Sequence, residues 1–442
     1  YKGGYFGTLM VPQSIPGGDF EGDYLAVAGR PPSELVIYQF SSVGEIMDGD
    51  INDRFPAGDR MDDDFNDSGF AAAIDAVPRW HDGARERLNS FVVVDSSDRW
   101  LTIVDLENSY VDHEMTYVGM DLASVATVTK GAGEWAEGFV VGAHNHCAPG
   151  DACPGKAVFV PGTLNTSQVI SLHEEVTDNS TIGLNDELGC SVASGMTGGD
   201  MPYLAVGSKK RVYIFLYDDT AGHYVFEQCI DGSANGFGTH LFAGKANNDD
   251  GIEDLFISSR MKDFDERGRP DEEIDGRYDK VAIVSGSRFV GDPTMPPAAC
   301  VSVDDIRDDG DLISTLSCKD VPGDEVQCGG SSYFGSSVAV GNVDGEGQPE
   351  IAVGVPGASV DGKENAGSVI MYNAVGADPA PVGALRTASP AKETYMGASV
   401  AALTIAGEDE FFASMPGEEK FLLFHCSGLG TDTPDHGDNI CR

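Results

Sequence analysis

Short runs of apolar residues, separated by Gly, Pro, Asp and Asn, follow one another along the whole chain. The runs FVVVDSS at 91–97, VYIFLY at 212–217 and VAIVSG at 281–286 are rich in β-branched and aromatic residues. Apolar positions with a helical period are scarce. This pattern predicts an all-β protein made of many short strands.

These runs belong to a repeating unit whose clearest copy reads YFGSSVAVGNVDGEGQPEIAVGVPGAS from Tyr333, followed by AGSVIMYNA from Ala366. An aromatic residue and a glycine open the unit, and a strand of small residues, an acidic loop and two further strands follow. Copies start near residues 5, 68, 117, 188, 237, 333 and 395. The glycines that anchor them are Gly7, Gly69, Gly119, Gly189, Gly238, Gly335 and Gly397.

Repeats of three or four strands must either leave sheet edges open or close into a ring. The seven copies therefore predict a seven-bladed β-propeller as a single domain over residues 1–425. The remaining residues 426–442 are expected to be a disulfide-bonded tail or linker. We expect each Phe or Tyr to pack between blades and each glycine to allow a close approach of backbone.

The opening Phe334-Gly335, the acidic loop at 342–350 and Gly354-Val355-Pro356-Gly357 resemble the FG-GAP repeat of integrin α-subunits and their bacterial relatives. The resemblance implies one seven-bladed propeller of FG-GAP-type repeats, with calcium in loops between the first and second strands. It also implies that ligands dock on the opposite face. An inserted adhesion domain of the von Willebrand A type is not visible in this chain.

The family's loop, Asp-x-Asp-x-Asp-Gly-x-x-Asp, surrounds one cation with alternate oxygen ligands. The matching ligands here are Asn342, Asp344, Glu346, the backbone carbonyl of Gln348, and Glu350. A second copy supplies Asn248, Asp250 and Asp254, with Asn247 in the first ligand position. We expect structural calcium at both loops, and solvated acidic hairpins are the alternative.

The nine cysteines favour an oxidising compartment. Close spacing pairs Cys147 with Cys153, Cys318 with Cys328, and Cys426 with Cys441; a weaker fourth pair is Cys190 with Cys229, which leaves Cys300 over. His144 and His146, next to Cys147, are interpreted as part of a polar loop rather than as metal ligands.

The net charge of −44, from 72 acidic and 28 basic residues, repels nucleic acid and anionic membranes. No apolar stretch reaches the roughly 18 residues of a membrane helix. The charge and the cysteines predict a secreted or cell-surface protein that does not insert into a membrane. They leave the oligomeric state open.

The main hypothesis is a binding module, adhesion-like and without catalysis, that holds a protein or glycan. By the family's layout its binding loops are 143–156, 260–279 and 355–367, with the Cys-rich segment 300–330 beside them. Motifs of a nucleophile elbow, a zincin, a P-loop or a dinucleotide fold do not occur in the sequence. Two alternatives stay open: a calcium-dependent propeller enzyme (a polysaccharide lyase or hydrolase, or a phosphoesterase), and a structural module of a larger surface protein.

Overall fold

The computed structural model places most strands and many of the connections between them. The residues it describes are 5–15, 22–30, 34–40, 54–56, 72–81, 86–94, 99–105, 113–118, 120, 122–130, 135–143, 155–175, 187–198, 201–232, 236–246, 251–259, 280–289, 300–318, 321–322, 326–329, 332–343, 348–373, 379–405, 408–418 and 420–424.

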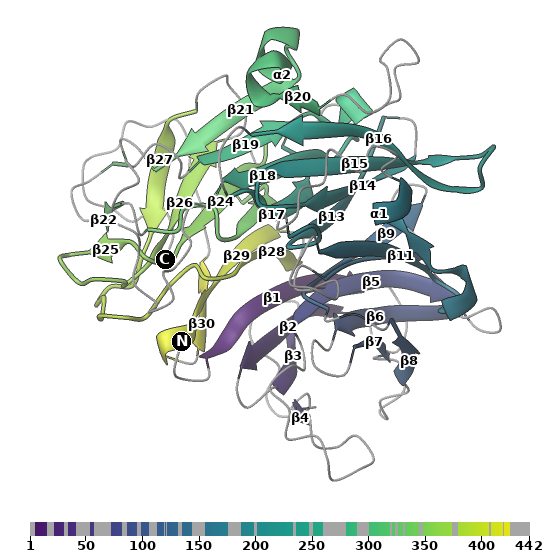
Figure 1. Cartoon of the computed structure of the whole chain (residues 1–442). Coiled ribbons are helices and arrows are strands. Elements are labelled where there is room, and N and C mark those ends of the chain that lie inside the picture. Colours follow the sequence, from purple (N-terminus) through teal and green to yellow (C-terminus); the bar gives the residue numbers. More distant parts are fainter. Residues whose placement is uncertain are drawn as a thin grey trace, which may run out of the picture.

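Apart from one two-stranded ribbon, the described strands form seven small sheets that radiate around a common axis (Figure 1). This confirms the predicted seven-bladed β-propeller. Blades 1 to 3 contain, in order, β1 (Tyr5–Ile15), β2 (Gly22–Arg30), β3 (Glu34–Phe40) and β4 (Arg54–Pro56); β5 (Ala73–His81), β6 (Glu86–Val94), β7 (Trp100–Asp105) and β8 (His113–Tyr117); and β9 (Ser124–Lys130), β10 (Trp135–Ala143), β11 (Lys156–Pro161) and β12 (Ile170–Ser171).

Blades 4 and 5 are linked by a strand that follows blade 5's third strand in the chain but pairs with blade 4. Blade 4 contains β13 (Val192–Met196), β14 (Pro202–Gly207), β15 (Arg211–Asp218), β16 (His223–Asp231) and, at its outer edge, β20 (Cys300–Ser302). Blade 5 contains β17 (Phe237–Gly244), β18 (Asp254–Ser259), β19 (Lys280–Val284) and β21 (Leu312–Ser317). The chain therefore leaves blade 5 after β19, adds β20 to blade 4, and returns as β21.

Blades 6 and 7 complete the ring. Blade 6 contains β23 (Val338–Gly341), β24 (Glu350–Val355), β26 (Ser368–Asn373) and β27 (Pro381–Leu385), and the described part of blade 7 contains β28 (Val400–Ile405), β29 (Glu408–Met415) and β30 (Lys420–Phe424). A separate ribbon pairs β22 (Val326–Gln327) with β25 (Ser359–Val360). The described helical segments are α1 (Leu172–Glu175), α2 (Val303–Asp309), η2 (Thr166–Gln168), η3 (Gly286–Phe289) and η4 (Pro416–Glu418).

The core is divided among the interfaces between neighbouring blades. Side chains alternate along each strand, so one strand can bury residues against the blades on both sides. In β14, Tyr203 and Ala205 pack toward blade 5, whereas Leu204 and Val206 pack toward blade 3. Among the described residues, the buried apolar side chains form seven such clusters, and one of them joins blade 7 to blade 1. The central strands are consequently apolar on both faces, which explains their uninterrupted hydrophobic runs.

The glycine that opens a repeat lies where two blades approach closely. Phe334 is fully buried and Gly335 has a φ of +83°. A Cβ on Gly335 would lie 2.7 Å from Ser258 Oγ of blade 5. Gly189, Gly238 and Gly397 have φ values of +84°, +83° and +84°. The predicted packing role of the Phe-Gly pair is therefore observed at Phe334 and Gly335.

Serine hydroxyl groups at the start of one blade form hydrogen bonds with the start of a neighbouring blade. Ser124 Oγ donates to Gly189 O at 3.0 Å, and Ser191 Oγ donates to Gly238 O at 2.7 Å. Ser337 Oγ donates to Gly397 O at 3.0 Å in the same way. The ring closes where Met10 N of blade 1 donates to Ser399 Oγ of blade 7 at 3.0 Å.

The cysteine pairs are partly as predicted. Cys318 and Cys328 are bonded to each other. The pairing of Cys190 with Cys229 is wrong, because Cys229 is bonded to Cys300 and Cys190 is a free thiol. Parallel pairing of β20 with β16 places Cys300 opposite Cys229, and Cys190 lies at the start of blade 4. The pairs Cys147–Cys153 and Cys426–Cys441, and also His144 and His146, lie outside the described residues.

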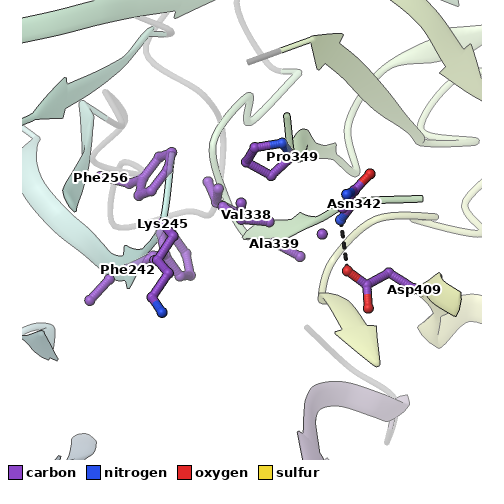
Figure 2. Close-up of a pocket in the computed structure, with 12 residues that line it drawn as sticks. Phe242, Lys245, Phe256, Val338, Ala339, Asn342, Pro349 and Asp409 are labelled. Atoms are coloured by element: carbon purple, nitrogen blue, oxygen red, sulfur yellow. Dashed lines mark hydrogen bonds between the residues drawn. The ribbon is translucent and has the colours of Figure 1, made fainter. Parts of the chain in front are cut away.

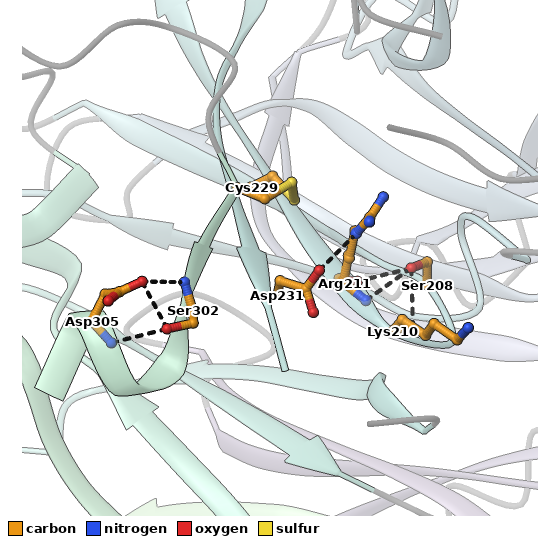
Figure 3. Close-up of polar contacts among 8 residues, drawn as sticks. Ser208, Lys210, Arg211, Cys229, Asp231, Ser302 and Asp305 are labelled. Carbon is orange, nitrogen blue, oxygen red and sulfur yellow. Dashed lines mark hydrogen bonds and ion pairs between the residues drawn. A yellow bond between two sulfur atoms is a disulfide. The ribbon is translucent and has the colours of Figure 1, made fainter. Parts of the chain in front are cut away.

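The segment around β20 is a docked strap, defined here as residues 300–310. Ser302 and Asp305 cap α2 reciprocally through side chain and backbone, and Gly310 ends the helix with a φ of +85° (Figure 3). Ile306 of α2 is fully buried in the cluster between blades 4 and 5. The strap thus covers part of the outer edge of β16, an edge that would otherwise be open to pairing with another chain.

Within the described residues, no helix has the length and apolar character required to cross a membrane.

Candidate functional site

The acidic hairpin of blade 6 joins β23 to β24 and contains the best predicted calcium loop. Gly341 pairs with Glu350, so both ends of the loop are held in register. The Glu350 side chain is almost fully buried, and its Oε2 accepts a hydrogen bond from Val343 N at 2.9 Å. This contact directs the carboxylate of the last predicted ligand back toward the start of the loop.

Asn342, the first predicted ligand, sits beside a carboxylate of the next blade. Its backbone N donates to Asp409 Oδ2 of blade 7 at 2.7 Å (Figure 2). Its side-chain oxygen Oδ1 is buried and has no hydrogen-bond partner among the described residues. Gln348 is exposed, and Asp344 and Glu346 lie outside the described residues. The described ends of the hairpin therefore provide an unused amide oxygen and a buried carboxylate, as a hard cation requires.

The hairpin of blade 5 is held by Asp254, which begins β18 and is fully buried. Its Oδ2 accepts from Ala246 N at 3.1 Å, and its Oδ1 accepts from Gly286 N at 3.2 Å. Asp254 thus occupies the same position in blade 5 as Glu350 does in blade 6, with both oxygens already bonded to backbone. The other predicted ligands, Asn247, Asn248 and Asp250, lie outside the described residues.

The described part of the chain contains no group of three or more His, Cys, Asp or Glu side chains placed to hold a metal ion. The fit of calcium at blade 6 thus depends on Asn342 and Glu350 from the described residues and on the intervening loop. At blade 5, the fit depends on the buried Asp254 carboxylate and on loop positions outside the described residues.

A pocket of about 300 Å³ lies between blades 5 and 6, directly beside the blade 6 hairpin (Figure 2). Phe242, Phe256 and Val338 provide apolar walls, and Lys245 and Asp409 lie on opposite sides. The pocket is lined by Phe242, Ala243, Gly244, Lys245, Phe256, Val338, Ala339, Val340, Gly341, Asn342, Pro349 and Asp409. Its wall therefore shares Asn342 and Pro349 with the hairpin.

A second cavity, of about 580 Å³, runs along the propeller axis and is lined by the first strands of all seven blades. Most of its lining residues are Ala, Ser and Val, as the small first-strand residues of the repeats predict. Asp75 is its one carboxylate among the described lining residues. Burial raises the pKa of Asp75 to about 6, although Thr127 N and Ala76 N donate to it at 2.6 and 2.9 Å.

The opposite end of blade 6 carries a firmly built loop, here called the ribbon loop and defined as residues 355–367. Pairing of β25 with β22 connects it to the segment that contains the Cys318–Cys328 disulfide. Arg386 Nη1 lies 3.0 Å from Asp361 Oδ2, and Lys392 Nζ lies 3.0 Å from Glu364 Oε2. Residues 361–364 are exposed. Of the other predicted binding loops, 260–279 lies outside the described residues and only 143 and 155–156 of the first are described.

Sequence reasoning missed the carboxylates that connect one blade to the next. Asp409 binds Asn342 N, Asp75 binds Thr127 N, and Glu253 Oε2 accepts from Met196 N at 2.9 Å. Burial raises the pKa of Glu253. Each partner is on a neighbouring blade, so only the order of blades around the ring could have indicated these contacts.

Comparisons with known proteins support the repeat. Residues 334–370 match the FG-GAP repeat model. No curated protein matches the chain. Two solved structures are similar to it. One is a crystal structure of BBS1N in complex with ARL6DN, soaked with lead, which is 12% identical in sequence, covers 90% of this chain and 86% of that chain, and has a TM-score of 0.45. The other is the same complex soaked with mercury, which is 10% identical, covers 90% of this chain and 84% of that chain, and has a TM-score of 0.44.

The family match covers the blade that contains Phe334-Gly335 and the 342–350 hairpin, so it confirms the resemblance on the residues that suggested it. An FG-GAP repeat set in a seven-bladed β-propeller is consistent with the N-terminal propeller family of integrin α-subunits.

Proposed function

We propose that this chain is a calcium-stabilised, non-catalytic binding module that holds a protein or glycan partner on the face of the ribbon loop. The observation that carries the proposal is the construction of that loop. It is fixed by β-pairing, a neighbouring disulfide and two ion pairs, yet residues 361–364 remain exposed. A surface that is ordered before binding loses less entropy when a partner docks.

Calcium is proposed at the blade 6 hairpin, on the opposite face. The unpartnered Asn342 Oδ1 and the buried Glu350 carboxylate support this assignment. A cation held by the folded hairpin and not by the unfolded chain would stabilise the propeller by mass action. It would also reduce repulsion among 72 acidic residues. The role of calcium is then structural.

The proposed location is secreted or at a cell surface. The two disulfides of the described residues, Cys229–Cys300 and Cys318–Cys328, support an oxidising compartment. The acidic surface makes a basic partner surface the best electrostatic complement.

Calcium binding is tested by thermal unfolding in calcium and in chelator. The variant Glu350→Gln removes one proposed ligand charge, and Glu364→Gln, an exposed residue of the ribbon loop, is the matched control. We expect calcium to raise the melting temperature of the control by several degrees and of Glu350→Gln by clearly less. At a calcium concentration of 100 Kd the stabilisation is about 2.7 kcal/mol per site. Equal shifts in both variants would remove the hairpin from consideration as a site.

Partner binding is tested by applying the labelled propeller to arrays of glycans and extracellular proteins. Glu364→Lys reverses a charge on the face that carries the ribbon loop. Asp219→Lys is the matched charge reversal on the opposite face, in the exposed loop between β15 and β16. Loss of a binding signal with Glu364→Lys alone supports the proposed face. Loss of that signal with Asp219→Lys alone contradicts it.

The enzyme alternative is tested by assaying turnover of polysaccharides and phosphate esters. Turnover that disappears in Asp75→Asn would place catalysis in the cavity along the propeller axis.

A further inference from the structure

The connection between β11 and β12, at the outer edge of blade 3, contains the tripeptide Asn165-Thr166-Ser167. Asn-x-Ser with a middle residue other than proline is the acceptor pattern for N-linked glycans. The pattern alone is common, so its structural setting decides whether it can serve.

Asn165 is exposed, in a short turn that ends with η2. Its Oδ1 accepts two hydrogen bonds from Ser167, one from the backbone N at 3.1 Å and one from Oγ at 2.7 Å. Its backbone oxygen accepts from Gln168 N at 2.9 Å. All three contacts use oxygens, and the side-chain nitrogen Nδ2 has no hydrogen-bond partner among the described residues.

The hydroxyl that the acceptor pattern requires is therefore bonded to the acceptor amide itself. Donors on Oδ1 draw electron density from the amide and make its N–H a better proton donor. The free Nδ2 on an exposed side chain can be approached without breaking a contact of the fold. Neighbouring Thr163, Ser167 and Gln168 are also exposed, so a bulky group on Nδ2 has room.

We propose that Asn165 is an N-glycosylation site. In the modification, Nδ2 forms a bond to the anomeric carbon of an oligosaccharide carried on a polyprenyl pyrophosphate. The bond from that carbon to the pyrophosphate oxygen breaks, and the lipid pyrophosphate leaves with the electron pair. The Nδ2 proton passes to a base of the membrane transferase. The proposal rests on the secretory location given under the proposed function.

The position of the turn has a consequence for binding. Strands β9, β10, β11 and β12 are antiparallel, so their connections alternate between the two faces of the ring. The β11–β12 turn lies on the same face as the first-to-second-strand hairpins, whereas the ribbon loop follows a second strand and lies on the other face. A glycan on Asn165 would cover the hairpin face near blade 3 and leave the ribbon loop free.

The test is site-specific glycan occupancy after secretion of the chain from eukaryotic cells with a leader peptide. Two further sequons, Asn66-Asp67-Ser68 and Asn179-Ser180-Thr181, must be separated from this one. Trypsin cuts after Lys156 and Lys209, and a glutamate-specific protease cuts after Glu174 and Glu175, so residues 157–174 form one peptide with Asn165 alone. Enzymatic release of the glycans in heavy-oxygen water then places a heavy-oxygen label on every copy of that peptide that carried a glycan at Asn165.

We expect most copies of the 157–174 peptide to carry the label in wild type, none in Ser167→Ala, and at least as many in Ser167→Thr. Ser167→Thr keeps the hydroxyl and controls for misfolding of the turn. An unlabelled wild-type peptide, with a co-expressed glycoprotein modified normally, would overturn the proposal. Because the leader supplies the compartment, that result would concern the turn and not the proposed function.

Discussion

At the residue scale, each described blade start from blade 4 onward combines two backbone positions of positive φ. The opening glycine is one, and the residue two positions before it is the other. The φ values of these earlier residues are +51° at Glu187, +90° at Gly236, +57° at Tyr333 and +54° at Tyr395. The opening glycine could be predicted from the repeat, whereas Glu187, Tyr333 and Tyr395 give no local signal for a left-handed conformation. The surrounding blade contacts impose it instead.

The opening glycine can be tested by adding a single methyl group. In Gly335→Ala, the new Cβ meets both an unfavourable φ of +83° and Ser258 Oγ at 2.7 Å. Gly222→Ala is the matched control, since its φ is +73° and no atom lies within 4 Å of a Cβ there. We expect a loss of about 1 kcal/mol for the control and about 2–4 kcal/mol for Gly335→Ala, measured by thermal or urea unfolding. Equal losses would mean that backbone strain alone, and not blade packing, demands the glycine.

Asp75 predicts a pH dependence of stability. Its pKa is about 6 in the folded protein, above the ordinary value of 3.8, so the folded state holds this proton more tightly. The stabilisation this gives is complete below pH 3.8, and it is lost as the pH rises through about 6. Relative to Asp75→Asn, wild type should therefore be about 1 kcal/mol more stable at pH 5 than at pH 8. Unfolding curves of both proteins at the two pH values measure this; a constant difference would contradict the raised pKa.

At the scale of elements, the strap shows which contacts the sequence could and could not predict. The hairpin ends at Asn342 and Glu350 follow from a local pattern, because ligands and turn lie in one short segment. The disulfide Cys229–Cys300 joins residues 71 positions apart, on strands assigned by sequence to different repeats. Spacing therefore favoured the wrong partner, Cys190. Asp409 was missed for the same reason, since its contact with Asn342 crosses from blade 7 to blade 6.

Removal of the Cys229–Cys300 disulfide should destabilise the fold more than removal of the free thiol of Cys190. Cys300→Ser removes a crosslink that closes a loop of 71 residues. We expect a loss of about 2–4 kcal/mol, mainly through greater freedom of the unfolded chain. Cys190→Ser is the control, because a hydroxyl can replace the thiol that donates to Gly238 O at 3.5 Å. Melting temperatures under non-reducing conditions compare the two. If both variants melt alike, the strap is held by Ile306 and the caps of α2 rather than by the disulfide.

At the scale of the whole molecule, the fold was the most predictable feature because the pattern of one blade occurs seven times in the sequence. The number of blades follows from the number of copies and does not depend on the details of any one copy. The same repetition makes the structure a closed series of similar interfaces, so each blade is stabilised by both of its neighbours. Met10 and Ser399 close this series between the first and last blades.

The net charge of −44 acts on the whole ring and predicts a specific response to salt. Like charges repel most when the chain is compact, so screening should favour the folded state. The Debye length falls from about 10 Å at 0.1 M to about 3 Å at 1 M. The melting temperature in chelator should therefore rise steeply with NaCl at low concentration and then level off. A general salting-out effect would instead raise the melting temperature continuously as salt is added. Melting curves in sodium sulfate, which acts by salting out, provide that comparison. A melting temperature insensitive to low NaCl would mean that the acidic residues are spaced too widely to repel one another, and that solvation rather than repulsion determines the effect of the charge.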